Sequence, residues 1–252
     1  MPYITVGDPD IPTTQKMLEA VYDAGAQICE LGFPFSDPIA DGPVIQASMK
    51  RALDAGANVQ KILHMVKQFR KSSAPSAQKL GLIAMLSFSM IYKIGTKQFI
   101  EQCKDAGIDG LIIPDLPIEQ SQQVTTIISD AGLICSFLVS PSTPIARAKK
   151  IAAISTGFLY MVARAGVTGE QKQIPQDLTS RITDLRTVTD LPIAVGFGIS
   201  TPRHVTQVVA VADAAIVGSA YMKTVERAIQ AQKNNITQDI AQLTSQLVAG
   251  LQ

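Results

Sequence analysis

The chain has 252 residues, 46 % of them hydrophobic, and contains no Trp. A chain of this length with enough aliphatic residues for a large core fits one domain better than several. Lys and Arg number 22 against 21 Asp and Glu, which gives a net charge of +1. Nucleic-acid-binding proteins usually carry a basic excess or a long basic run, so this balance argues against nucleic acid as a partner.

The side chains that most often bind metals are few and scattered. Cys29, Cys103 and Cys135 form no Cys-x-x-Cys or Cys/His pattern, so we expect no metal site. His64 and His204 lie in helical stretches without a second ligand type nearby. We expect surface or core roles for both histidines, and Cys29 and Cys135, which lie in apolar runs, read as small core residues.

The sequence also indicates where the protein works. No N-terminal signal pattern is present, and no apolar run reaches the roughly 18 residues that a membrane span needs. Unpaired cysteines fit a reducing compartment. We therefore expect a cytoplasmic protein that has no membrane partner.

Eight short apolar runs recur along the chain, each followed by a turn and an amphipathic stretch. Most runs are continuous rather than alternating, which is typical of parallel strands buried on both faces. The predicted strands are Tyr3–Val6, Gln27–Leu31, Gly81–Leu86, Gly110–Ile113, Ile134–Val139, Gly157–Val162, Ile193–Phe197 and Ala214–Val217.

Helical patterns fill the stretches between these strands. Three of them end in Asp-Ala-Gly, and the glycines Gly25, Gly107 and Gly132 suit a left-handed helix C-cap. The predicted helices include Thr13–Ala24, Lys97–Asp105, Glu119–Asp130, Pro202–Ala210 and Gln238–Val248, and Lys71–Gln78 reads as a surface loop.

The eightfold alternation of strand and helix predicts a parallel α/β fold. A single (β/α)8 TIM barrel needs about 250 residues, so we expect one barrel domain over residues 1–252. An open, doubly wound sheet is the alternative that the pattern alone leaves.

Glu30 is the first candidate functional residue. Active sites of such barrels lie at the carboxyl ends of the strands, and Glu30 interrupts the second apolar run near its end. A buried carboxylate is costly unless it is paired or functional. Glu30 is therefore either a structural carboxylate bonded to neighbouring N–H groups or a general acid/base with a pKa raised by an apolar pocket.

Asp41 lies eleven residues after Glu30, in a loop with three prolines and two glycines. Asp41-Gly42-Pro43 by itself could be only a turn. Glu30 and Asp41 together could supply two carboxylates to one pocket, which is the minimum for adding one proton and removing another.

Glycine-rich turns follow the last two predicted strands. Gly198 comes after the seventh strand, and Gly218 with Ser219 comes after the eighth. A helix start after such a turn presents free N–H groups to an anion, and barrels commonly bind phosphate near these strands. We therefore expect a substrate that carries a phosphate. The glycines of Arg164–Gly169, after the sixth strand, fit either a flexible lid or an ordinary turn.

Several of these motifs, in this order, resemble those of the tryptophan synthase α subunit family. The long run Glu30–Pro43, ELGFPFSDPIADGP, is the most specific of them. The other matching stretches are Tyr3–Pro9 (YITVGDP), Arg164–Gly169 (RAGVTG), Gly196–Ile199 (GFGI) and Gly218–Ala220 (GSA). The resemblance extends over essentially the whole chain and implies the same barrel fold.

The resemblance also implies roles for single residues. Glu30 would be the main acid/base and Asp41 the second catalytic carboxylate, while Thr168 would help to close a lid near Asp41. The residues implied to line an indole pocket are Tyr3, Met85, Ile112, Leu138, Tyr160 and Phe197. Those whose backbone would meet the phosphate are Gly169, Gly198, Gly218 and Ser219.

The implied reaction is a retro-aldol cleavage of indole-3-glycerol phosphate to indole and glyceraldehyde 3-phosphate. It needs no metal and no organic cofactor. The implied partner is a tryptophan synthase β subunit, in a heterotetramer of two α and two β subunits, and the loop around Pro34, Asp37 and Pro38 would face it.

Two features depart from the family pattern. Ser87 and Ser89 stand where the family usually has Tyr and Asn, which predicts looser hydrogen bonding around the catalytic carboxylate. We also expect the helix that family members usually place before the first strand to be missing.

Three other functions remain open at this point. The barrel could be a non-catalytic regulatory partner of the β subunit, which the Ser87 and Ser89 changes suggest and the intact Glu30 and Asp41 oppose. It could be a stand-alone indole-producing lyase. It could also be another phosphate-binding barrel enzyme, such as a sugar-phosphate epimerase, but that function needs metal-binding His and Asp residues at strand ends.

Overall fold

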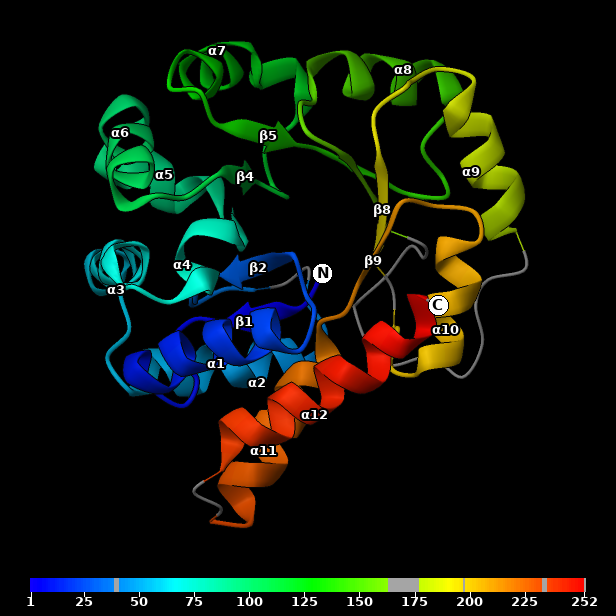
Figure 1. Ribbon diagram of the computed structural model, residues 1–252. Coiled ribbons are helices and arrows are strands. Elements are labelled where there is room, and N and C mark those ends of the chain that lie inside the picture. Colours follow the sequence, from blue (N-terminus) through cyan, green and yellow to red (C-terminus); the bar gives the residue numbers. More distant parts are fainter. Residues whose placement is uncertain (39–40, 163–176, 197, 233–234, 252) are drawn as a thin grey trace.

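The computed structural model describes residues 1–38, 41–162, 177–196, 198–232 and 235–251. Strands form a central ring and helices surround it (Figure 1). The strands are β1 (Tyr3–Thr5), β2 (Ile28–Gly32), β3 (Gly81–Met85), β4 (Gly110–Ile112), β5 (Ile134–Ser136), β6 (Leu138–Val139), β7 (Leu159–Val162), β8 (Ile193–Gly196) and β9 (Ala214–Ile216).

The strands pair in parallel and in chain order, first β1 to β5 and then β6 to β9. The predicted strand Ile134–Val139 is interrupted at Phe137, whose carbonyl accepts a hydrogen bond from Tyr160 N at 3.0 Å. Tyr3 N donates to Val217 O at 2.8 Å and closes the ring between the last strand and the first. The expectation of a (β/α)8 barrel over an open sheet is confirmed.

Twelve α-helices and two short 3-10 helices occur in the described residues. They are α1 (Ile11–Asp23), α2 (Pro43–Asp54), α3 (Val59–Lys71), α4 (Pro75–Lys79), α5 (Phe88–Ile94), α6 (Thr96–Ala106), η1 (Ile118–Gln120), α7 (Gln122–Asp130), α8 (Ile145–Ile154), α9 (Leu178–Arg186), α10 (Pro202–Val209), α11 (Ser219–Gln230), α12 (Ile236–Val248) and η2 (Ala249–Leu251). Among these residues, none of the helices has both the length and the apolar character to cross a bilayer.

The local predictions for the helices hold with two corrections. Gly25, Gly107 and Gly132 all have positive φ just after a helix, as the C-cap argument requires. The stretch Lys71–Gln78 is not all loop, because Pro75 begins α4 and suits the first turn of a helix. The helix predicted from Glu119 begins as the 3-10 turn η1 before α7.

Alternation along the strands divides the apolar residues into two layers. The layer inside the ring contains Ile83, Ile112, Phe158, Ala194 and Ile216. The layer between the ring and the helices contains, among others, Ile4, Leu31, Leu82, Leu111, Leu159 and Val195. The three cysteines are free and buried, which fits the core role predicted for Cys29 and Cys135. A charged residue at an inward position is therefore surrounded by apolar side chains.

Candidate active site

Glu30 occupies an inward position on β2. It pairs in register with Tyr3 on β1 and with Ile83 on β3, whereas Leu31 next to it belongs to the outer layer. The Glu30 side chain is fully buried, and neither carboxylate oxygen has a hydrogen-bond partner among the described residues. The structure therefore does not support the reading of Glu30 as a carboxylate satisfied by neighbouring N–H groups.

Asp41 lies in the turn before α2, and one side chain of that helix donates hydrogen bonds to the turn. Gln46 Nε2 donates to Asp41 O at 2.7 Å and to Pro38 O at 3.2 Å. Asp41 N donates to Pro38 O at 3.1 Å, which closes the turn. In the same β2–α2 loop, Asp37 is exposed to solvent and Pro34 is buried.

The charge of Asp41 acts on Glu30 and on two buried tyrosines, Tyr3 and Tyr160. Burial first, and the charge of Asp41 second, raise the pKa of Glu30 from 4.5 to about 8. Burial raises the pKa of Asp41 to about 6. Burial also raises the pKa of Tyr3 and Tyr160, and the charges of Asp41 and Glu30 raise both further. The barrel thus brings the two predicted carboxylates to one apolar site.

These pKa values give the two carboxyl groups different states near neutral pH. Glu30, with a pKa of about 8, is mostly protonated and can donate a proton. Asp41, with a pKa of about 6, is mostly ionised and can stabilise a positive charge. Two acids whose surroundings separate their pKa values are the arrangement that acid/base chemistry requires.

Most of the predicted apolar lining comes together inside the ring. Ile112 belongs to the inner cluster, and the partly buried side chains of Met85, Leu138 and Tyr160 pack against it. Tyr3 is buried and is grouped with the larger core, but it pairs with Glu30 across β1 and β2. Phe197, Thr168 and Gly169 lie outside the described residues.

The predicted anion site lies at the start of α11. Gly218 is the N-cap of this helix and makes no side-chain cap, and Ser219 is its first residue. The first N–H groups of a helix have no intrahelical acceptor, so this end can bind an anion. Gly198 lies two residues after β8, the strand that pairs with β9 just before this turn.

Ser87 and Ser89 form a polar network of their own. Ser87 Oγ lies 2.8 Å from Ser89 Oγ and donates to Asp115 Oδ2 at 2.6 Å. Phe88 N donates to the other oxygen of Asp115 at 2.7 Å. Asp115, which no sequence motif pointed to, thus accepts from Ser87, and Ser89 joins the network through Ser87.

A second network, which no sequence motif predicted, joins the β1–α1 loop, α2 and α11. Asp8 is fully buried, and Arg51 Nε and Nη2 donate to its two carboxylate oxygens at 2.9 and 2.8 Å. Arg51 Nη1 also contacts Glu226 at 3.3 Å. The Gly7-Asp8-Pro9 part of the first motif could have drawn attention to Asp8, but nothing in the sequence singles out Arg51.

The histidines have positions that fit structural roles. His204 is buried, and its Nδ1 accepts a hydrogen bond from Ser200 N at 3.4 Å. His64 lies on α3 at the edge of a surface groove away from the barrel interior. Within the described parts of the chain, no cluster of three or more His, Cys, Asp or Glu side chains is arranged to hold a metal ion.

Comparison with known proteins gives a single family. The family model described as tryptophan synthase alpha chain matches residues 1–250. The tryptophan synthase alpha chain of Rhodopirellula baltica is 42 % identical over 235 residues, which is 93 % of this chain and 84 % of that relative. The one from Rippkaea orientalis is 43 % identical over 224 residues, covering 88 % and 82 %.

Solved structures agree with these relatives. Tryptophan synthase subunit alpha from Legionella pneumophila str. Paris has a TM-score of 0.90 and 36 % identity, covering 99 % of this chain and 91 % of that one. A chain of the tryptophan synthase complex from Pyrococcus furiosus has a TM-score of 0.87 and 33 % identity, covering 98 % and 96 %.

Proposed function

Because this chain belongs to the tryptophan synthase alpha chain family, we propose that Glu30 and Asp41 are the catalytic carboxylates of its reaction. That reaction cleaves indole-3-glycerol phosphate to indole and glyceraldehyde 3-phosphate, a lyase step of tryptophan biosynthesis. The observation that carries the proposal is Glu30, a fully buried carboxyl group without a described hydrogen-bond partner and with a pKa of about 8.

In the proposed mechanism, protonated Glu30 first donates its proton to C3 of the indole ring. The ring nitrogen then carries positive charge, which ionised Asp41 stabilises. The hydroxyl group on the carbon attached to C3 next gives its proton to the Glu30 carboxylate and becomes the aldehyde oxygen. The C–C bond breaks, its electron pair enters the ring, and indole leaves while Glu30 is again protonated.

The remaining site residues bind and orient the substrate in this proposal. Tyr3, Met85, Ile112, Leu138 and Tyr160 surround the indole ring with apolar surface. The N-terminus of α11, with Gly218 and Ser219, binds the phosphate together with Gly198. Thr168, Gly169 and Phe197 are assigned to the same site from the family motifs alone.

We also propose that the chain works as one barrel domain in the cytoplasm, paired with a tryptophan synthase β subunit in a heterotetramer of two α and two β subunits. The structural relative from Pyrococcus furiosus comes from a tryptophan synthase complex, which supports this partner. The exposed Asp37 in the β2–α2 loop, beside Pro38, is the expected contact.

The test is indole release from indole-3-glycerol phosphate, with and without a tryptophan synthase β subunit, for the wild type and for Glu30→Gln. We expect release that rises with the β subunit and falls by about a thousandfold or more in Glu30→Gln, the range for a residue that both donates and accepts the proton. Glu101→Gln, an exposed glutamate on α6, is the matched control. A wild type that releases no indole in either condition contradicts the proposal and leaves a ligand-binding regulatory partner.

A further inference from the structure

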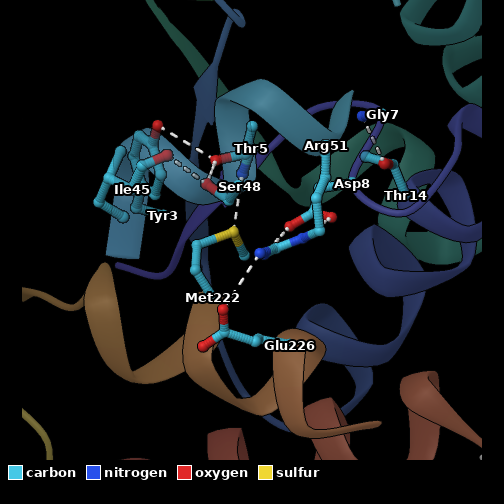
Figure 2. A network of polar contacts seen from close by, with 10 residues as sticks. All are labelled: Tyr3, Thr5, Gly7, Asp8, Thr14, Ile45, Ser48, Arg51, Met222 and Glu226. Atoms are coloured by element: carbon cyan, nitrogen blue, oxygen red, sulfur yellow. Dashed lines mark hydrogen bonds and ion pairs between the residues drawn. The ribbon is translucent and has the colours of Figure 1, made fainter. Parts of the chain in front are cut away.

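Arg51 joins three elements that lead to the two halves of the site (Figure 2). It lies on α2, pairs with Asp8 in the β1–α1 loop through two hydrogen bonds, and reaches Glu226 on α11. The Asp8 side chain is 0 % exposed, while those of Arg51 and Glu226 are 27 % and 35 % exposed. This three-residue cluster, Arg51 with Asp8 and Glu226, is called the Arg51 clamp below.

The loop that carries Asp8, the anchor of the clamp, is closely packed. Gly7 has a φ of +95°, and a β-carbon there would lie 2.6 Å from Cβ of Ala57, so the loop packs closely on the segment that follows α2. Gly7 N donates to Thr14 Oγ1 on α1 at 2.9 Å. Asp8 is therefore held from two sides, and a bidentate Arg–carboxylate pair transmits that position to Arg51.

One arm of the clamp leads to Asp41. Helix α2 begins at Pro43, two residues after Asp41, and its Gln46 side chain binds the Asp41 carbonyl. A rotation or shift of α2 therefore moves the Asp41 turn. Ser48, on the same helix, adds a second connection, since its Oγ lies 2.6 Å from Thr5 Oγ1 on β1.

The other arm leads to the expected phosphate site. Glu226 lies about two turns along α11 from Ser219, the first residue of that helix. Helix α11 packs against both α2 and β1, and Thr5 N donates to Met222 Sδ at 3.4 Å. The clamp thus connects the Asp41 turn with the phosphate-binding end of α11 through one buried residue, Asp8.

We propose that Arg51 is a positioning residue for the lyase reaction: through Asp8 and Glu226 it fixes the Asp41 turn relative to the phosphate-binding end of α11. The inference rests on the proposed function of Glu30, Asp41 and the α11 N-terminus. It assigns the two arms different effects, because displacement of Asp41 slows the chemical step while displacement of α11 weakens phosphate binding.

The test compares kcat and KM for indole-3-glycerol phosphate in Arg51→Met, Arg51→Lys and Glu226→Gln. In Arg51→Met we expect kcat to fall by about tenfold or more, with a higher KM, since small misplacements of a catalytic group are costly. Arg51→Lys should lie between the wild type and Arg51→Met, because an ammonium cannot bind both oxygens of Asp8 as a guanidinium does. Glu226→Gln should raise KM by about threefold with kcat unchanged, in keeping with a partly exposed ion pair.

The matched control is Lys50→Met, which removes a cation from the neighbouring position of the same helix. Lys50 Nζ lies 2.8 Å from Asp54 Oδ2 in a surface ion pair, and both side chains are more than half exposed. Removal of Lys50 should therefore change neither kcat nor KM. Thermal unfolding of each variant separates a lower folded fraction from a change in kcat or KM. If Arg51→Met does not fold, Arg51→Lys and Glu226→Gln decide the question.

Calorimetric binding of glyceraldehyde 3-phosphate separates this proposal from the proposed function. A wild type without turnover contradicts the proposed function and with it the Asp41 arm; the placement of the phosphate-binding end of α11 by the clamp then stands if Glu226→Gln binds the product more weakly than the wild type. Folded clamp variants that keep kcat, KM and product affinity within twofold of the wild type overturn the positioning role, as does a wild type that neither turns over nor binds the product.

Discussion

Tyr3 stands over Gly32 on the neighbouring strand, so close that a β-carbon at Gly32 would lie 2.1 Å from Tyr3 Oη. Tyr160 stands over Gly196 in the same way, with the corresponding distance at 2.6 Å. Each inward glycine thus makes room for an aromatic ring beside the carboxylates. The glycines matter here for close approach, because neither has a positive φ.

The Tyr3–Gly32 contact predicts that Gly32→Ala is damaging. The added methyl group must displace the Tyr3 ring or the β2 backbone. Gly32 follows Leu31 directly and stands two residues after Glu30, so a shift of the backbone there also moves Glu30. We expect the free energy of unfolding to fall by about 1–3 kcal/mol, the usual cost of overpacking. The rate of indole release should fall at least tenfold. Chemical denaturation and the indole assay measure both effects.

The control for this substitution is Gly81→Ala at the start of β3, where the nearest atom to an added β-carbon is 3.4 Å away. It should change stability and rate far less. Equal effects of the two substitutions would mean that the Tyr3 contact is not what makes Gly32 necessary.

The pKa values belong to the free protein, so they predict a bell-shaped dependence of kcat/KM on pH. Below about pH 6 Asp41 becomes protonated and cannot stabilise the indole nitrogen, and above about pH 8 Glu30 loses the proton that it must donate. Indole release should therefore be fastest between these values. Asp41→Asn should be slower throughout and should lose the acidic limb, and its basic limb should move to lower pH because the charge of Asp41 no longer raises the pKa of Glu30. A wild-type rate that keeps rising above pH 8 would contradict the role of protonated Glu30.

Stability should depend on pH through Glu30. Its pKa is about 8 in the folded protein and 4.5 when exposed, so the folded state holds a proton that the unfolded chain has released. The wild type should thus lose stability relative to Glu30→Gln as pH rises from about 4.5 to about 8, and stay level above that. Each unit of pKa difference corresponds to about 1.4 kcal/mol, so the total is of the order of a few kcal/mol. Urea unfolding at a series of pH values measures the difference, which no exposed-residue variant such as Glu101→Gln should reproduce.

Ser219→Asp should separate stability from binding. Ser219 is buried, so a carboxylate there loses hydration, while the dipole of α11 stabilises the negative charge. Because these effects oppose each other, the thermal midpoint should fall by only a few degrees. The same charge repels a phosphate at this position, and KM for indole-3-glycerol phosphate should increase by about tenfold or more. Asn58→Asp, a cap substitution at the start of α3 away from the site, should leave KM unchanged. An unchanged KM in Ser219→Asp would remove this helix end from the phosphate site.

Much of the fold can be predicted from the sequence, because its signals are local. Continuous apolar runs mark strands buried on both faces, and all eight predicted strands exist, with the fifth interrupted at Phe137. Gly25, Gly107 and Gly132 mark helix ends because glycine adopts a left-handed backbone conformation without steric strain. Glu30 can be found in the same way, since a charge within a buried run is costly and therefore conspicuous.

The tertiary structure decides what depends on residues far apart in the chain. Asp8 and Arg51 are 43 positions apart, and Arg51 and Glu226 are 175 apart, so no local pattern could pair them. Ser87 finds its acceptor in Asp115 only because β3 and β4 lie side by side. The pKa of Glu30 depends on enclosure by neighbouring strands and on the charge of Asp41. The sequence by itself determines which residue types stand at the strand ends, whereas closure of the ring determines which of them meet and how strongly their charges interact.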